Sequence, residues 1–155
     1  MEAFFEPGAL RDGEMDLVLA AFVPAAAGAS RVPFYQFEMR VGRARAGHIA
    51  LRIADDEWTV RYYGQIGYRV EPAFRGRRFA ARACQLLRPL ALRHGMERLW
   101  ITCDPENLPS NRTCQILGAR LVEIVDVPPD LELYRRGERR KCRYRWDLRA
   151  PAGGA

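Results

Sequence analysis

The residues best suited to chemistry lie in a short basic turn, Arg75-Gly76-Arg77-Arg78-Phe79-Ala80. The turn follows a β-like run over residues 65–70 and opens a long helical pattern. A turn of this kind directs consecutive backbone N–H groups, and the positive end of a helix dipole, toward one spot. The anion that fits such a spot is a phosphate or pyrophosphate, so the sequence predicts a phosphorylated cofactor.

Composition narrows the class of protein. The chain has 155 residues, of which 48% are hydrophobic and 28% charged, and no apolar run approaches the roughly 20 residues that span a bilayer. The acidic start, residues 1–6, does not resemble a secretory signal, so we expect a cytoplasmic protein without a membrane partner. The net charge of +6 comes from arginine, since Lys141 is the only lysine. An arginine-rich genome explains this better than nucleic-acid binding, which we do not expect.

The four cysteines are Cys84, Cys103, Cys114 and Cys142. They form no C-x-x-C pair and have only two histidines as further partners, so no metal site is expected. A disulfide framework is uncharacteristic of a chain this long without a signal peptide. We therefore expect most of these side chains to be small buried hydrophobes.

The elements that would position the turn form one domain over residues 1–149, followed by a flexible tail at 150–155. Alternating patterns predict strands, and small and Pro-rich residues predict a loop over Pro24–Pro33. Glu14–Val23 could be an edge strand or a helix. The expected strands are Phe34–Val41, His48–Ile53, Trp58–Tyr63, Gln65–Val70, Leu99–Cys103, Ala119–Val127 and Lys141–Leu148.

Two helices follow the turn. Apolar residues at helical spacing predict the first from Gly76 to His94, with Pro89 kinking it or leaving one carbonyl unpaired. The second runs from Asn107 to Leu117 and ends at Gly118. The order of elements predicts an α/β (α+β) fold, a mixed sheet with helices packed on its faces.

Both halves of this pattern resemble a known family. Arg75, Gly76 and Ala80, followed after a strand by Asn107, Ser110 and Gly118, are similar to the GNAT superfamily of acyl-CoA-dependent N-acyltransferases, over about residues 47–148. The resemblance is to bacterial members with unassigned acceptors, and it implies a mostly antiparallel central sheet with helices on both faces. Three positions depart from the pattern, Arg78 for a glycine, Cys114 for a tyrosine and Ala119 for an aromatic residue.

The resemblance implies that acetyl-CoA is the co-substrate and that no metal takes part. The N–H groups of residues 75–80 would bind the pyrophosphate, and Arg78 is expected to have a helical φ. Tyr68 and Val70 would pair through their backbones with the pantetheine arm. Asn107 and Ser110 would contact the cofactor, although Asn107 could equally be an N-cap. For Arg77 we favour a solvated surface role.

The implied activity is direct transfer of an acetyl group to a primary amine in a ternary complex. A backbone N–H near Val70 would polarise the thioester carbonyl. The acid could be Cys114, Tyr144 or Tyr134. Alternatively, the reaction needs no acid, because CoA thiolate is a tolerable leaving group. Glu71 is one candidate base, beside Glu38, His48 and Asp104. A second hypothesis is a GNAT-fold protein that binds acyl-CoA without turnover. The acceptor could be a small molecule or a peptide, and the protein could form a homodimer.

Overall fold

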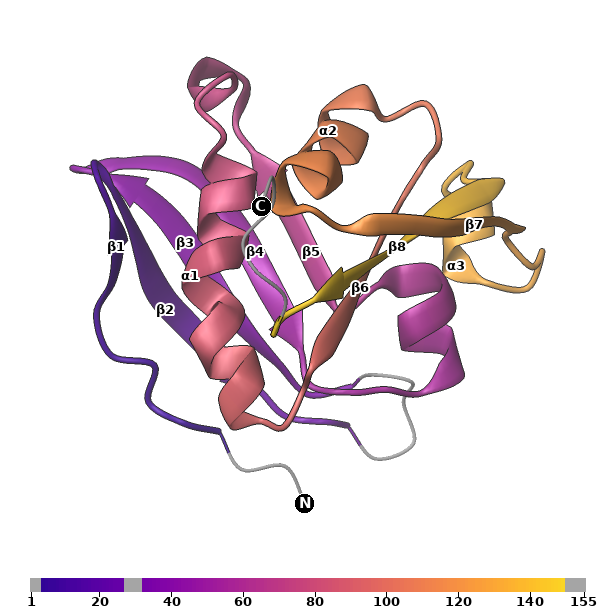
Figure 1. Cartoon of the computed structure of the whole chain (residues 1–155), viewed down its shortest axis with the longest axis horizontal. Coiled ribbons are helices and arrows are strands. Elements are labelled where there is room, and N and C mark those ends of the chain that lie inside the picture. The colour runs from indigo at the N-terminus through magenta and orange to yellow at the C-terminus, as the bar shows by residue number, and fades with distance from the viewer. Residues whose placement is uncertain (1–3, 27–31, 150–155) are drawn as a thin grey trace.

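The computed structural model describes residues 4–26 and 32–149, which form two antiparallel sheets with helices packed on them (Figure 1). The predicted loop over 24–33 is therefore described only in part, and the predicted tail lies outside the described residues. The elements are β1 (Leu10–Asp12), β2 (Met15–Val23), β3 (Phe34–Val41), β4 (Ala44–Arg52), the helical turn η1 (Thr59–Tyr63), β5 (Ile66–Val70), the 3₁₀ turn η2 (Pro72–Phe74), α1 (Phe79–Arg93), β6 (Arg98–Cys103), α2 (Leu108–Leu117), β7 (Arg120–Asp126), α3 (Glu132–Arg135) and β8 (Arg140–Asp147).

The larger sheet contains β1 to β5 in chain order, each strand antiparallel to the next. Because side chains alternate along a strand, Tyr35, Phe37 and Met39 all face inward from β3 and are fully buried. The residues between them are only half-buried and form a more polar face. Helix α1 packs on the apolar face and crosses the strands (Figure 1). One face of the larger sheet therefore packs against the core, and the other face is more polar and only half-buried.

The smaller sheet has the order β6-β8-β7 and is also antiparallel. Strand β8 is central, and Cys142, Tyr144 and Trp146 alternate into the core cluster that both sheets share. All four cysteines are free and buried, as the sequence predicts. No helix within residues 4–26 and 32–149 combines the length and apolar character needed to cross a membrane.

The two sheets meet at one point and then separate. Strands β5 and β6 are not paired with each other, although the Gln65 N–H, just before β5, donates to the Trp100 carbonyl of β6 at 2.7 Å. Beyond that contact the two strands belong to different sheets, which leaves a gap along β5. The candidate site lies along this gap.

The mixed α/β fold with antiparallel sheets is confirmed, but three local expectations need correction. Residues 58–63, predicted to be extended, form η1, because Asp56 accepts from the Thr59 N–H and hydroxyl and the Trp58 and Tyr62 rings lie 5.7 Å apart at i,i+4 spacing. Strand β2 lies between β1 and β3, so it is not at the edge. The segment between β7 and β8, for which the sequence predicts no helix, contains α3.

Helix α1 continues past Pro89 to Arg93. Proline has no N–H to donate to the carbonyl four residues earlier, which is that of Gln85. Apolar burial on both sides of this position, by Cys84, Leu87 and Leu90, holds the helix against the sheet.

Candidate cofactor site

The outer edge of β5 carries backbone groups that face the gap. The Glu71 N–H donates to the Ala46 carbonyl at 2.8 Å, and the Arg52 N–H donates to the Gln65 carbonyl at 2.7 Å. In an antiparallel ladder, alternate residues bond to the partner strand and the others point away. The backbone groups of residues 67, 69 and 71, and the Gln65 carbonyl, therefore face β4. The N–H and C=O groups of Tyr68 and Val70 face the gap.

The turn after β5 is held in an unusual conformation. Arg75 Nε donates to the Val70 carbonyl at 3.0 Å, which fastens the turn to the end of the strand. Gly76 has φ +88° and Arg78 has φ +60° with ψ 26°. The expected helical φ at Arg78 is wrong, because this residue is the left-handed N-cap of α1 rather than part of its first turn. Among the described residues it is the only non-glycine with positive φ, a conformation that costs about 1–2 kcal/mol.

The predicted row of donors over residues 75–80 needs one correction, because the Arg75 N–H donates to the Pro72 carbonyl at 3.3 Å. The backbone N–H groups of residues 76–81 donate to no other described residue, and the first bond of α1 runs from the Arg82 N–H to the Arg78 carbonyl at 2.9 Å. The first N–H groups of a helix have no carbonyl partner within the helix, and the helix dipole adds partial positive charge there. This segment can therefore supply several N–H donors to one anion.

Four residues of this segment, Gly76, Arg78, Phe79 and Ala80, border a cavity of about 540 Å³ between the end of β5, the turn and α2. Every cofactor residue predicted from the sequence lines it except Arg77. The Arg77 guanidinium instead lies 5.7 Å from the Phe74 ring centroid and 5.9 Å from that of Phe79. The predicted residues along the cavity are Tyr68, Val70, Arg75, Gly76, Arg78, Phe79, Ala80, Asn107 and Ser110.

The α2 wall is anchored to β5 by side chains. Asn107 Oδ1 accepts the Ser110 N–H at 3.2 Å, so the alternative that Asn107 is an N-cap is confirmed. The Tyr68 hydroxyl lies 2.8 Å from Ser110 Oγ. Burial raises the pKa of Tyr68 far above its ordinary value, so this hydroxyl keeps its proton at neutral pH.

The sequence reasoning missed part of the lining. The further residues are Arg69, Phe74, Pro109, Arg112, Thr113 and Ile116. Helical spacing offers a signal for two of them, because Thr113 follows Ser110 by three residues and Ile116 follows Thr113 by three. Thr113 therefore lies beside Ser110 on the surface of α2, and Ile116 lies beside Thr113.

None of the candidate acids and bases named from the sequence lines this cavity, neither Cys114, Tyr144 and Glu71 nor the further candidates Tyr134, Glu38, His48 and Asp104. Cys114 is fully buried, and burial raises the pKa of its thiol. The Tyr144 hydroxyl, also buried, donates to Asn111 Oδ1 at 2.6 Å and so ties β8 to α2. Glu71 follows Val70 directly, is 37% exposed, and has its carboxylate 3.9 Å from Arg69 Nε.

The other candidate bases have structural partners or environments of their own. Glu38 is paired with Arg40 at 3.3 Å and with Arg45 at 3.5 Å. Asp104 Oδ1 accepts the Glu106 N–H at 2.8 Å. Burial lowers the pKa of His48, which lies opposite Arg69 across β4 and β5. No single one of them is set apart as a base by these contacts.

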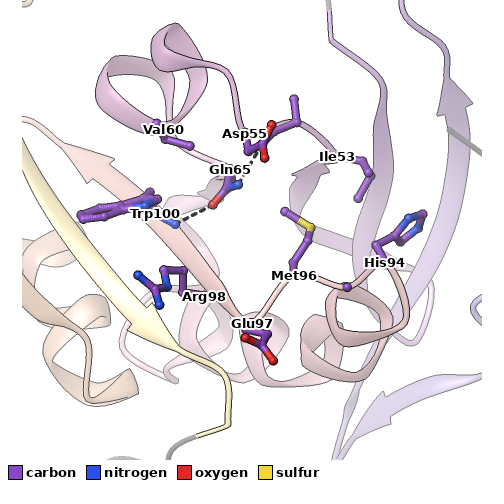
Figure 2. Close-up of a pocket in the computed structure, with 11 residues that line it drawn as sticks. Ile53, Asp55, Val60, Gln65, His94, Met96, Glu97, Arg98 and Trp100 are labelled. Carbon is purple, nitrogen blue, oxygen red and sulfur yellow. Dashed lines mark hydrogen bonds between the residues drawn. The ribbon is translucent and has the colours of Figure 1, made fainter. Parts of the chain in front are cut away.

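Two further cavities flank the gap. One, of about 670 Å³, lies on the polar face of the larger sheet and is lined by Phe34, Arg52, Trp58, Tyr63, Asp56, Asp130 and Glu132, with Val32, Thr59 and Leu131. The other, of about 460 Å³, lies at the closed end of the gap near Gln65 and Trp100 (Figure 2). The cavity beside the basic turn is thus lined by residues of β5, whereas the polar cavity is lined by residues of β3, β4, η1 and α3.

Solved structures share this fold. One neighbour is the microcin C7 self immunity acetyltransferase MccE in complex with acetyl-CoA and AMP, at 20% identity and TM-score 0.59, covering 74% of this chain and 61% of that one. A GNAT-family acetyltransferase from Bacillus anthracis gives 21% identity and TM-score 0.57, covering 74% and 67%. A protein described as a putative acetyltransferase gives 17% identity and TM-score 0.64, covering 96% and 89%.

These identities establish a common fold, and this chain spans about three fifths of the length of MccE. No curated protein matches the sequence. The family model for the acetyltransferase (GNAT) domain matches residues 3–120, about three quarters of the chain. That match includes β5, the basic turn, α1 and α2, so the chain belongs to the GNAT acetyltransferase family.

Proposed function

We propose that this protein is an N-acetyltransferase that moves an acetyl group from acetyl-CoA to a primary amine within a ternary complex. The observation that carries the proposal is a row of backbone groups without protein partners along one cavity. Tyr68 presents its N–H and C=O groups and Val70 its N–H along the gap, and the turn from Gly76 to Ala80 presents N–H donors at its end. A cofactor with an amide-bearing arm and a terminal pyrophosphate matches both features in that order.

The cofactor would bind by pairing its pantetheine amides with the free edge of β5, much as an added strand would. Its pyrophosphate would accept from the N–H groups of residues 76–81, and the Arg78 guanidinium would add charge. Asn107 uses its side-chain oxygen for the cap, which leaves its NH₂ group for the cofactor. The Arg77 side chain has no part in this arrangement, because its guanidinium lies over the Phe74 and Phe79 rings.

Transfer requires a neutral amine nitrogen to attack the thioester carbonyl carbon. A C–N bond forms, the C–S bond breaks, the CoA thiolate leaves, and the amine loses one proton to a base. The gap-facing N–H of Val70 would stabilise the oxyanion that develops on the carbonyl. Glu71, next in the chain and accessible to water, is our proposed base. Cys114 and Tyr144 we assign to the core, because both are buried away from the cavity.

The acceptor would enter from the polar cavity on the other face of the larger sheet. Arg52 lines that cavity and donates to the Gly64 carbonyl at 2.9 Å, and its guanidinium lies over Gly67 on β5. An amine leaving this cavity would therefore reach β5 one residue before Tyr68. The carboxylates and aromatic rings of the lining suit a cationic small molecule or a peptide amine.

Acetyl-CoA binding is the first test. At a concentration of one hundred times its Kd, acetyl-CoA should stabilise the protein by about 2.7 kcal/mol, a rise in Tm of roughly 5–10 °C, and CoA should compete. Differential scanning fluorimetry measures the shift. A folded protein that shows no shift at millimolar acetyl-CoA would contradict the proposal.

Among the described residues, no aspartate or glutamate lines the cavity beside the basic turn. This observation also supports a second function, an acyl-CoA-binding protein without turnover. Thiol release with a panel of amines, polyamines, aminoglycosides and peptide N-termini separates the two. Release above the rate of spontaneous thioester hydrolysis with any acceptor excludes the second function. Binding without release from any member of the panel favours it.

A further inference from the structure

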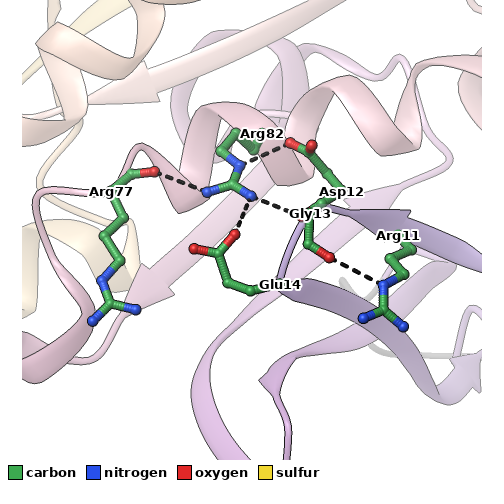
Figure 3. A network of polar contacts seen from close by, with 6 residues as sticks. All are labelled: Arg11, Asp12, Gly13, Glu14, Arg77 and Arg82. Atoms are coloured by element: carbon green, nitrogen blue, oxygen red, sulfur yellow. Dashed lines mark hydrogen bonds and ion pairs between the residues drawn. The ribbon is translucent and has the colours of Figure 1, made fainter.

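Arg82, on the second turn of α1, makes an unusually dense set of contacts (Figure 3). Its Nε donates to Asp12 Oδ2 at 2.8 Å, and its Nη2 donates to the Asp12 carbonyl and to Glu14 Oε1, each at 2.7 Å. Its Nη1 donates to the Arg77 carbonyl at 3.3 Å. One side chain therefore joins the β1–β2 turn to the basic turn before α1.

Arg82 also fixes the peptides on both sides of Arg78. The Arg82 side chain holds the Arg77 carbonyl, and the Arg82 backbone N–H holds the Arg78 carbonyl at 2.9 Å. Arg78 has the positive φ, which is disfavoured for any residue with a side chain. Strained conformations persist where surrounding contacts over-determine them, and these two bonds are such contacts.

The bond from Arg82 to the Arg77 carbonyl also sets the direction in which the Arg78 N–H points. All peptide bonds in the described residues are trans, so the carbonyl of Arg77 and the N–H of Arg78 point in opposite directions. With the carbonyl turned toward Arg82, the Arg78 N–H turns away from it. Arg78 lines the cofactor cavity, and Arg82 does not. The contact therefore directs this donor away from the β1–β2 turn.

Arg82 is itself unavailable to the cofactor. Asp12 and Glu14 pair with its guanidinium, which lies over the Phe79 ring at 5.0 Å from the centroid. Its charge is thus matched by two carboxylates on the side away from the cavity. Arginine suits this role because its planar fork reaches several acceptors at once, which a lysine ammonium on a flexible stem does not.

We propose that Arg82 is a positioning residue that pre-organises the pyrophosphate-binding turn by tying it to the β1–β2 turn through Asp12 and Glu14. The proposal rests on the proposed function, since it assumes that residues 76–81 bind the cofactor's pyrophosphate. Strands β1 and β2 lie about 70 positions before the turn, yet they would set its affinity for the cofactor. Fixing a loop in its bound conformation improves affinity by reducing the cost of ordering it.

The test compares acetyl-CoA with S-acetylpantetheine, which has the thioester arm but no pyrophosphate. In Arg82→Lys, the Kd for acetyl-CoA by calorimetry should rise about tenfold, as expected if the competent turn is populated one tenth as often. Affinity for S-acetylpantetheine should stay within about twofold. The double variant Asp12→Asn/Glu14→Gln leaves the turn and α1 unchanged and should weaken acetyl-CoA binding in the same selective way.

Arg93→Lys is the matched control. Arg93 lies on the same helix and also contacts the N-terminal segment, through the Glu6 carbonyl at 3.4 Å and the Phe5 ring at 4.2 Å, but at the far end from the turn. It should leave the Kd for acetyl-CoA unchanged. Unchanged acetyl-CoA affinity in folded Arg82→Lys, or equal weakening of both ligands, would overturn the role of Arg82. Wild-type protein that binds neither ligand would refute the proposed function, and this role with it.

Discussion

The two ends of the gap between β5 and β6 are built in opposite ways. At the closed end, the Gln65 N–H bonds to the Trp100 carbonyl, and the Gln65 side chain bonds to the Trp100 N–H at 2.8 Å and to the Ala54 carbonyl at 2.8 Å (Figure 2). Gln65 is only 3% exposed. At the open end, the gap-facing groups of β5 and the N–H groups of residues 76–81 have a cavity before them instead.

The comparison shows how one strand can be both structural and functional. Where the protein satisfies its own buried polar groups, the two sheets are fixed relative to each other. Where it leaves donors unpaired beside a cavity, a ligand can supply the acceptors. Substitutions at the closed end should therefore affect folding, whereas those at the open end should affect the cofactor. Three experiments test this distinction between the closed and open ends of the gap.

The largest effect is expected at the closed end. Gln65→Leu keeps the approximate shape of the side chain but leaves the Trp100 N–H and the Ala54 carbonyl without their partner. Each buried group left unsatisfied costs about 1–3 kcal/mol, so the loss of two partners should lower the free energy of unfolding by about 2–6 kcal/mol. Urea denaturation followed by circular dichroism measures it.

Gln115→Leu provides the control for that experiment. Gln115 lies exposed on α2, where its side-chain oxygen accepts a long 3.5 Å bond from Arg112. Surface substitutions of this kind usually change stability by less than about 0.5 kcal/mol. Equal losses of unfolding free energy in Gln65→Leu and Gln115→Leu would mean that the closed end contributes no more to stability than an exposed position.

An intermediate effect is expected from Cys114→Ala, on the α2 helix that walls the open end. Because the thiol is buried and its pKa raised, it keeps its proton throughout the pH range of an assay and has no path to the substrate. The variant should lose about 1 kcal/mol of stability, yet keep acetyl-CoA affinity and any thiol release per folded molecule. A loss of release at unchanged affinity would restore Cys114 as the acid.

The smallest effect is expected from Arg78→Gly. Glycine accepts positive φ without strain, so the variant should gain at most about 1 kcal/mol of stability, offset in part by the greater freedom of its unfolded chain. It retains the backbone N–H, so the Kd for acetyl-CoA should change less than about threefold if backbone donors dominate binding. A tenfold or larger rise would show that the guanidinium is the main contact.

Local sequence patterns predicted the elements that depend on local rules. The helical spacing after Gly76, the Asn107 cap and the Gly118 end are properties of single turns, and α1 and α2 are found there. The pattern failed at Trp58–Tyr63, where aromatic residues favour strands by propensity. There the Asp56 cap and the ring pair of Trp58 with Tyr62 select a helical turn instead.

Residue types and short spacings are enough to predict the succession of elements from β5 to β7, the GNAT membership and the basic turn that borders the cavity. The left-handed Arg78 and the neutralised Arg82 emerge only in the tertiary structure. Each of these depends on contacts between residues far apart in the chain, as between Arg82 and Asp12. Residue spacing carries no record of such contacts, so only the folded packing could reveal them.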